Sequence, residues 1–144
     1  MAEVDPTRSR NMAAIRSRDT APELIVRKQL FARGFRYRLN VRGLPGSPDL
    51  VFPKHRAAVL VHGCFWHRHE GCRFFQLPKT RPEFWDRKLT VNATRDLRDI
   101  EKLRSLQYRV AVVWECATRT NKLTVLPQLE AFLVGDQPFL EIRG

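Results

Sequence analysis

The most regular pattern of apolar and polar positions in this chain has a helical period and runs from about residue 81 to residue 107. Steps of three and four residues place one set of side chains on a single helical face: Leu89, Asn92, Asp96, Ile100 and Leu103. Because an unpaired carboxylate is costly to bury, we expect Asp96 to face a polar cleft or to pair with a specific group. A break in this helix near residues 92–94 is an open alternative.

Shorter patterns predict the remaining elements. Thr20 and Glu23 have the spacing of a capping box, which predicts a helix that begins after Thr20 and ends near Gly34. Apolar runs bounded by turn residues predict strands over 49–52 and 57–61 joined as a hairpin, an interior strand over 108–115, a helix over 123–133 and a short strand over 139–142. Helices that alternate with strands indicate a sheet covered by helices, of the α/β or α+β class.

Length and charge narrow the possibilities. A chain of 144 residues with 43% hydrophobic content has the size of one globular domain, so we expect a single domain over 1–144. The 26 Lys and Arg residues against 15 Asp and Glu give a formal net charge of +11, which favours a polyanionic partner. A basic soluble enzyme without a nucleic-acid role is the alternative.

Part of this charge is concentrated near the N-terminus. Four arginines surround the apolar residues Met12 and Ile15: Arg8, Arg10, Arg16 and Arg18. Residues 1–18 are therefore predicted to form a basic arm or helix that lies along DNA phosphates, with a solvated tail as the alternative.

Targeting signals and cysteine use indicate the compartment. No stretch approaches the roughly 20 apolar residues that span a bilayer, and MAEVDPTRSR lacks the apolar core of a signal peptide. We therefore expect a cytoplasmic protein with no membrane partner. Because disulfide frameworks are rare in that compartment, the three cysteines are interpreted first as metal ligands.

The stretch VHGCFWHRHEGC, residues 61–72, contains most of a candidate zinc site. Three ligands come from one tight loop, and the remaining cysteine lies just past a predicted strand: Cys64, His69, Cys72 and Cys116. Use of every cysteine favours a closed structural site over an open catalytic one. His62 and His67 are rival ligands, and unrelated buried thiols are the alternative to a metal site.

Phe65 and Trp66 lie between these ligands in the sequence. A loop held by a metal can present aromatic side chains rigidly, as a protein needs when it separates stacked base pairs. On a strongly basic chain this placement suggests an exposed wedge, and packing in the core is the alternative.

At this point the chain resembles the very-short-patch-repair DNA mismatch endonucleases. The resemblance runs through separated stretches in the same order: RSRNMAAIRSRDTAPE, LPGSPDLVF, HGCFWHRHEGC, RPEFW, NATRD and VVWEC. It implies a restriction-endonuclease-like α/β core, with a central mixed sheet flanked by helices and a structural zinc. It also implies a Mg²⁺-dependent endonuclease that nicks double-stranded DNA 5′ of the thymine in T:G mismatches, which arise by deamination of 5-methylcytosine.

The resemblance further implies roles for particular residues. Asp49 would bind Mg²⁺ with help from the carbonyl of Val61, and His67 would be the general base. The supporting polar shell would be Glu23, His62 and Asp96, and the zinc ligands would be Cys64, His69, Cys72 and Cys116. The DNA contacts would be Phe65, Trp66 and His67 beside the mismatch from the major groove, and the segment around Met12 and Ile15 from the minor groove.

The sequence departs from the family pattern in the zinc loop and beside it. One extra residue precedes Cys72, and Val61 stands where a polar residue such as threonine is expected. Two alternatives therefore stay open: a nicking endonuclease for another mismatch or for intact duplex, and a non-catalytic zinc-stabilised DNA-binding module. The resemblance also implies a nucleoid-associated monomer, with downstream repair proteins as further partners.

Overall fold

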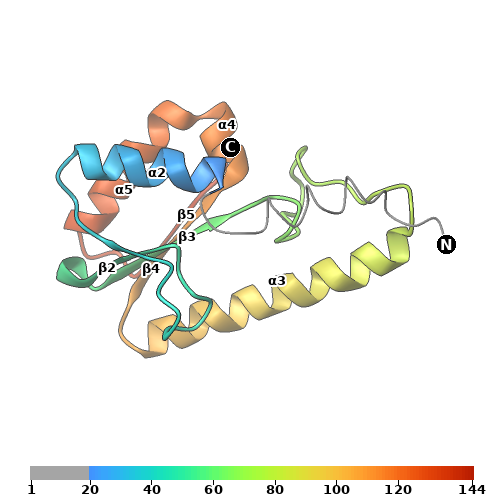
Figure 1. Ribbon diagram of the computed structural model, residues 1–144, viewed down its shortest axis with the longest axis horizontal. Coiled ribbons are helices and arrows are strands. Elements are labelled where there is room, and N and C mark those ends of the chain that lie inside the picture. The colour runs from blue at the N-terminus through green and yellow to red at the C-terminus, as the bar shows by residue number, and fades with distance from the viewer. Residues whose placement is uncertain (1–19) are drawn as a thin grey trace.

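A five-stranded sheet organises residues 20–144, the part of the chain that this computed structural model describes (Figure 1). The strands follow sequence order across the sheet: β1 (Arg38–Leu39), β2 (Leu50–Phe52), β3 (Ala57–His62), β4 (Arg109–Trp114) and β5 (Phe139–Ile142). β1, β2 and β3 pair antiparallel, whereas β3, β4 and β5 pair parallel. The expected mixed sheet is therefore confirmed, and β4 is an interior strand as predicted.

The predicted hairpin joins β2 to β3. Proline fixes φ and lacks an N–H, so Pro53 ends β2 and begins a short 3-10 helix (Pro53–His55). Arg56 then adopts a left-handed conformation with φ 50°, and the chain reverses. The register pairs Leu50 with Val59, which places the preceding Asp49 near the last residues of β3.

Helices cover both faces of the sheet (Figure 1). α2 (Ala21–Ala32), α4 (Glu115–Thr120) and α5 (Lys122–Val134) lie on one face, and the long α3 (Pro82–Ser105) crosses the other. Parallel neighbours need a crossover connection, and α3 supplies it between β3 and β4, while α5 supplies it between β4 and β5.

β3 shows how the sequence builds two cores. Ala57 and Val59 face the core under α2 and α5, whereas Ala58 and Leu60 face the core under α3, together with Leu103. Successive side chains of a strand point to opposite faces, and both faces here are covered. A nearly continuous apolar run is therefore what this strand requires.

The carboxyl ends of β3 and β4 lie side by side, with His62 paired to Trp114, and this end of the strands is called the carboxyl edge of the sheet. The long loop over 63–81 and the short α4 both begin at this edge. Side chains that follow parallel strands converge at such an edge, which is where ligands bind in open α/β sheets.

Several boundaries differ from the sequence predictions. α3 runs without a break, so the alternative of an interruption near residues 92–94 is wrong. β4 ends at Trp114, one residue early, because Glu115 begins α4, an element that the sequence pattern does not predict; nor does it predict the two-residue β1. The predicted arm over 1–18 lies outside the described residues. Within residues 20–144, no helix is both long and apolar enough to cross a membrane.

Candidate active site and metal centre

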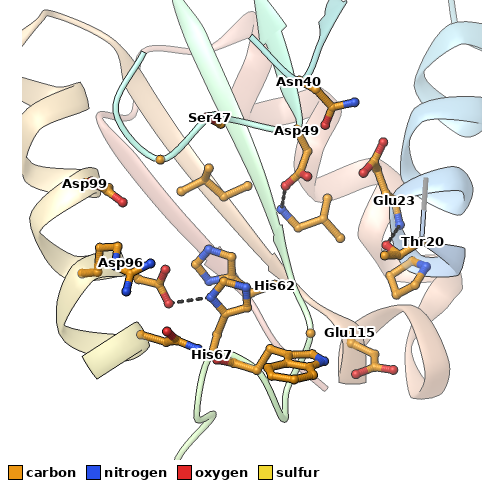
Figure 2. Close-up of a pocket in the computed structure, with 18 residues that line it drawn as sticks. Thr20, Glu23, Asn40, Ser47, Asp49, His62, His67, Asp96, Asp99 and Glu115 are labelled. Carbon is orange, nitrogen blue, oxygen red and sulfur yellow. Dashed lines mark hydrogen bonds and ion pairs between the residues drawn. The ribbon is translucent and has the colours of Figure 1, made fainter. Parts of the chain in front are cut away.

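A cleft of about 340 Å³ opens at the carboxyl ends of β3 and β4, between α2 and α3 (Figure 2). Its α2 wall carries Glu23, and its α3 wall carries Asp96 and Asp99. The structure brings all the predicted catalytic residues into this cleft: Glu23, Asp49, His62, His67 and Asp96. Their roles remain predictions, but their proximity is a property of the fold.

Asp49 lies at the floor of the cleft, immediately before β2. Its Oδ2 accepts a hydrogen bond from the backbone N–H of Val61 at 2.6 Å. Burial raises the pKa of Asp49 to about 7, the Val61 hydrogen bond opposes the rise, and the neighbouring Glu23 carboxylate adds to it. Two carboxylates in a poorly solvated pocket repel each other, and a bound cation would relieve that repulsion. The donor set therefore fits a hard cation that prefers oxygen ligands.

The backbone of Val61 places a further oxygen near this carboxylate. In an extended strand the N–H and the C=O of one residue point to the same edge. Since the Val61 N–H points at Asp49, its carbonyl points to the same side of β3. The β2–β3 ladder ends at the Leu50–Val59 pair, so this carbonyl lies beyond the ladder.

Glu23 combines a structural position with a place in the cleft. Its backbone N–H donates to Thr20 Oγ1 at 3.5 Å, which confirms the predicted helix cap. Its side chain lines the cleft, and Arg27 Nη1 donates to its Oε2 at 3.0 Å. Because Glu23 is only 1% exposed, its carboxylate is held by these contacts rather than solvated freely.

His67 and Asp96 form a close pair on the α3 side of the cleft. His67 Nδ1 lies 2.5 Å from Asp96 Oδ2, so the ring and the carboxylate are in direct hydrogen-bond contact. Asp96 therefore faces the cleft and also has a specific partner, as its position on the apolar stripe led us to expect. When the ring is neutral and Nδ1 carries the proton, Nε2 is an acceptor. This is the arrangement of a general base oriented by a carboxylate.

His62, the last residue of β3, is buried and stacks on His67 with ring centroids 3.9 Å apart and planes within 4°. Burial lowers the pKa of His62 well below its ordinary value, and the charges of His67 and His69 lower it further. His62, His67 and Asp96 are close enough to hold a metal ion. However, nitrogen lone pairs lie in the ring plane, so parallel stacked rings cannot both reach one ion unless a ring turns. The stacked geometry therefore favours proton transfer at His67.

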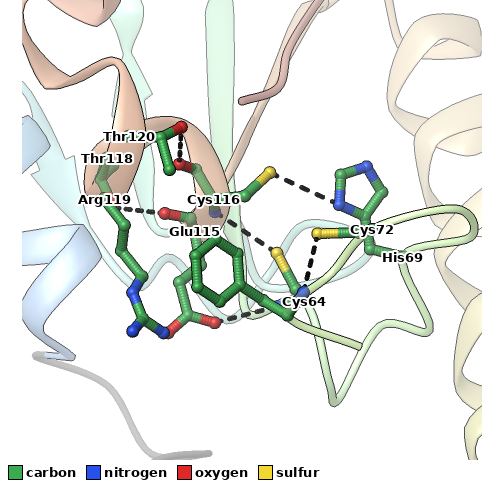
Figure 3. Close-up of polar contacts among 9 residues, drawn as sticks. Cys64, His69, Cys72, Glu115, Cys116, Thr118, Arg119 and Thr120 are labelled. Atoms are coloured by element: carbon green, nitrogen blue, oxygen red, sulfur yellow. Dashed lines mark hydrogen bonds and ion pairs between the residues drawn. The ribbon is translucent and has the colours of Figure 1, made fainter. Parts of the chain in front are cut away.

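A second cluster joins the loop after β3 to the start of α4 (Figure 3). It consists of the four predicted zinc ligands, whose candidate ligand atoms lie within 4.8 Å of one another: Cys64, His69, Cys72 and Cys116. His69 Nδ1 is 3.6 Å from Cys116 Sγ, and the corresponding edge of a tetrahedral zinc site is about 3.6 Å. The cluster could therefore hold a metal ion such as zinc. The rival ligands His62 and His67 line the cleft instead.

Backbone donors surround the sulfur atoms of this cluster. The three donor–acceptor pairs are Cys116 N to Cys64 Sγ at 3.3 Å, Phe74 N to Cys72 Sγ at 3.4 Å and Gly144 N to Cys116 Sγ at 3.1 Å. Such donors stabilise the thiolate, which is the form that binds a metal. Burial and the neighbouring cysteines raise the pKa of Cys64 well above its usual range, and a bound cation would reverse that effect.

The extra residue in the loop leaves the ligand cluster intact. Gly71 has φ +71°, a left-handed conformation that glycine adopts without strain, and Cys72 follows it directly. His69 is held in place by stacking on Trp114, with ring centroids 3.8 Å apart. Burial and the charge of Arg143 lower the pKa of His69, which favours the neutral form that a metal needs.

The expectation of an exposed wedge is wrong for Trp66 in this structure. Trp66 is 8% exposed, and its ring packs against Phe65 and Trp85 with centroid distances of 5.2 and 5.9 Å. Phe65 is half-buried and also contacts Trp85. Removing these rings from water is favourable, so core packing, the alternative, describes the observed position. Whether the rings enter DNA stays a prediction.

Trp114 is a residue of this region that sequence reasoning missed. One face of its ring stacks on His69, and its edge meets His62 at a centroid distance of 5.2 Å. Its Nε1 donates to Glu141 Oε2 at 2.7 Å. Trp114 thus lies between the cysteine–histidine cluster and the histidine pair, and an apolar strand ending gave no signal of this position.

Asn92 and Arg95 are two further residues of the cleft that were missed as site residues. Asn92 Nδ2 donates to the carbonyl of Trp66 at 3.2 Å, which ties α3 to the loop that carries His67. The sequence could have identified Asn92, since it is a polar residue on the same apolar helical face as Asp96. Arg95 adds a cation to an otherwise acidic lining, and nothing in its spacing distinguishes it from other surface arginines.

Comparison with known proteins identifies similar chains. The family model described as DNA mismatch endonuclease Vsr matches residues 3–73. The DNA mismatch endonuclease Vsr of Escherichia coli (strain K12) is 45% identical over 134 residues, which cover 90% of this chain and 85% of that protein. The type II nicking enzyme V.XorIIP of Xanthomonas oryzae pv. oryzae is 48% identical over 122 residues, 85% of each chain. The type II nicking enzyme V.NmeAIP of Neisseria meningitidis is 39% identical over 125 residues, 85% of this chain and 89% of that protein.

Proposed function

Because the chain belongs to the Vsr family of DNA mismatch endonucleases, we propose that it nicks double-stranded DNA on the 5′ side of the thymine in a T:G mismatch, the product of 5-methylcytosine deamination. Family membership makes the protein a DNA endonuclease, a hydrolase of phosphodiester bonds. The observation that carries the finer proposal is the cleft in which Asp49, Val61 and the His67–Asp96 pair meet. The mixed sheet around it supports a restriction-endonuclease-like core, and a single asymmetric nick needs only a monomer.

Mg²⁺ is the catalytic metal in this proposal. Asp49 and the Val61 carbonyl would hold it, with Glu23 beside them. When bound, the ion neutralises charge on the phosphate and assists deprotonation of water. Oxygen donors favour a hard cation of this kind over softer metals.

His67 would act as the general base in the same cleft. Its Nε2 would take the proton of the attacking water, while Nδ1 stays hydrogen-bonded to Asp96. A bond forms between the water oxygen and phosphorus as the bond to the leaving oxygen breaks, and the leaving oxygen takes a proton from solvent. Asp96 would hold the tautomer that presents Nε2, and the stacked His62 would restrict rotation of the ring.

Asp96→Asn should lower the single-turnover nicking rate by about 10² to 10⁴-fold, because an amide can stabilise the wrong tautomer of His67. Affinity for the same duplex should change much less. Asp99→Asn is the matched control, since Asp99 lies on the same wall but has no contact with His67 among the described residues. Equal rate losses in the two variants would mean that cleft charge, rather than orientation of His67, limits the reaction.

Zinc is the proposed ion in the cysteine–histidine cluster. Three thiolates and one imidazole fill a tetrahedron and leave no open position, which is the pattern of a structural site. Bound there, zinc would join the loop over 63–81 to α4 through Cys116. It would thereby hold His67, two residues before the ligand His69, at a fixed depth in the cleft.

Phe65, Trp66 and His67 are the proposed wedge beside the mismatch. A minor-groove arm would be formed by residues outside the described range: Arg8, Arg10, Met12, Ile15, Arg16 and Arg18. Trp66 would exchange its packing against Trp85 for stacking on a base, which contributes about 1–3 kcal/mol. Poorly paired steps cost less to open, so such an exchange favours mismatches before any base is read.

Trp66→Leu should reduce nicking of a T:G duplex by roughly 10-fold or more, the equivalent of one lost base stack. Binding to matched duplex should change little. Trp85→Leu removes a ring from the same aromatic cluster and should lower the melting temperature similarly while nicking is largely kept. If both variants lose nicking equally, Trp66 acts only through packing.

A supercoiled plasmid that carries one T:G mismatch tests the enzyme class. We expect Mg²⁺-dependent conversion to the open circle, with little conversion of the matched plasmid. Equal conversion of both would favour the second candidate, a site-specific nicking enzyme, as the names of the relatives V.XorIIP and V.NmeAIP suggest. Tight binding without conversion would favour a non-catalytic DNA-binding module.

A further inference from the structure

Most basic residues of α3 gather on one flank of the helix. Basic residues follow one flank at steps of seven and three or four residues: Lys88, Arg95, Arg98 and Lys102. We call these four residues the basic stripe. Of the acidic residues of α3, Asp96 and Asp99 lie on the cleft wall and Glu83, Asp86 and Glu101 on the remaining surface. Asp99 is one turn from Arg95 and Lys102, and Glu101 is one turn from Arg98.

The basic stripe has no carboxylate partners within residues 20–144. Arg95, Arg98 and Lys102 are exposed, Lys88 is half-buried, and none of the four has an ion pair or a side-chain hydrogen bond to another described residue. Arg98 and Lys102 are four residues apart, a spacing at which like charges destabilise a helix. A set of unpaired, mutually repelling cations is explained by an anionic ligand better than by stability.

The stripe passes the reaction site at Arg95. Arg95 lines the cleft with Asp49 and His67, and it is the one Lys or Arg in the described part of that lining. A phosphate that enters among carboxylates needs positive charge, and the guanidinium fork of Arg95 can supply two hydrogen bonds to it. From Lys88 to Lys102 the stripe extends about 21 Å along the helix, a length that corresponds to roughly six base pairs of duplex measured along its axis.

We propose that the basic stripe of α3 is a DNA-backbone track, which binds the phosphates that continue along the duplex from the scissile one, with Arg95 nearest the cleft. This inference rests on the proposed function and deepens it, because it assigns a surface for the substrate's backbone. Phosphate contacts carry no base information. The track therefore acts on matched and mismatched duplexes alike, and discrimination is left to other residues.

A charge-matched pair of double variants tests the track. Arg98→Gln with Lys102→Gln removes two stripe cations, and Arg104→Gln with Lys122→Gln removes one cation from the opposite flank of α3 and one from α5, on the other face of the sheet. Binding is measured by fluorescence anisotropy on 20-base-pair T:G and T:A duplexes in Mg²⁺-free buffer over a series of KCl concentrations. The stripe variant should lower the slope of log affinity against log salt by about two, and should weaken both duplexes roughly 10-fold near physiological salt.

The control variant should keep a slope close to that of the wild type. Equal slope changes in the two double variants would overturn the proposal in favour of a general effect of net charge, and an unchanged slope in the stripe variant would overturn it directly. The stripe variant should melt close to the wild-type temperature, because the Arg98–Lys102 repulsion is removed together with weak attractions to Glu101 and Asp99. Unfolding at the assay temperature would assign the affinity loss to folding and overturn the track.

The slope comes from binding alone and does not depend on nicking. A wild-type protein that does not nick T:G DNA would contradict the proposed function and leave the slope measurable. Normal nicking with an unchanged slope would contradict only the track. Arg95→Gln adds a second readout, since its loss should weaken binding and also slow single-turnover nicking at saturating enzyme.

Discussion

Asp49→Asn is expected to abolish Mg²⁺-dependent nicking, with a loss of about 10³-fold or more in the single-turnover rate. Asparagine keeps the shape of the side chain and can still accept the Val61 N–H, but a neutral amide holds a hard divalent cation far less well than a carboxylate does. Affinity for T:G duplex in Mg²⁺-free buffer should be kept or improved, since a negative charge leaves the cleft. If binding and nicking disappear together, Asp49 is a structural residue.

The same variant should be more stable than the wild type when Mg²⁺ is absent. The fold raises the pKa of Asp49 from 3.8 to about 7, so ionisation of this carboxyl opposes folding. The cost is absent below about pH 4, grows as the pH rises toward 7, and is constant above that. At about 1.4 kcal/mol per pKa unit, the gain in the variant approaches at most about 4 kcal/mol at pH 8 and is smaller at pH 5.5. Denaturant unfolding of the zinc-loaded wild type and variant at pH 5.5 and pH 8 measures this difference in the free energy of unfolding. A difference that does not grow with pH contradicts the raised pKa of Asp49.

Cys116→Ser is expected to cause the largest loss of stability. Structural zinc can contribute on the order of 10 kcal/mol or more to folding, and serine is a poor substitute for a thiolate ligand. Cys116 Sγ also accepts the Gly144 N–H and lies beside His69, so the change removes several contacts of one buried cluster. Elemental analysis should find close to one zinc per wild-type chain and little in the variant, and the melting temperature should fall by at least about 15 °C.

Wild-type protein stripped of metal is the control for Cys116→Ser, because all three cysteines belong to the cluster. It should melt as low as the variant and should recover when zinc is returned. The variant should not recover. A metal-free wild-type protein that melts normally would remove the structural role from the cluster.

Elements with a strong local signal could be predicted from the sequence. The strand over 139–142 matches β5, and the proline turn fixes the β2–β3 hairpin. α4 could not be predicted, because six residues are too few to form a helix by their own propensity. Its position depends on tertiary contacts such as the hydrogen bond from Cys116 N to Cys64 Sγ, which join residues far apart in the chain.

The candidate site also contains residues that the sequence could predict and residues that it could not. Spacing pointed to the four members of the cysteine–histidine cluster with His62 and His67 as rival ligands, and the structure places the four together. Asp96 stood out because a carboxylate on an apolar stripe needs a partner, and His67 is that partner. The remaining catalytic candidates depended on the family resemblance, since the distance between Asp49 and Val61 N–H is set by strand pairing rather than by spacing in the sequence.

The position of Trp66 shows where sequence reasoning fails. Its spacing between two ligands gives no information on which way the ring turns. The ring turns toward Trp85 on α3, a partner that only the folded chain brings within reach. Exposure of a single side chain depends on such packing, so the sequence could suggest a wedge but could not predict its position in the fold.

Mapping the nick on end-labelled duplexes that differ at one base, T:G against T:A, tests the proposed activity most directly. The flanking sequence is randomised, and Asp49→Asn is run beside the wild type in Mg²⁺. We predict one nick, on the thymine strand and 5′ of the mismatched thymine, in the T:G duplex with the wild type alone. Cleavage of both duplexes at equal rates, or cleavage of the guanine strand, would contradict the proposed function.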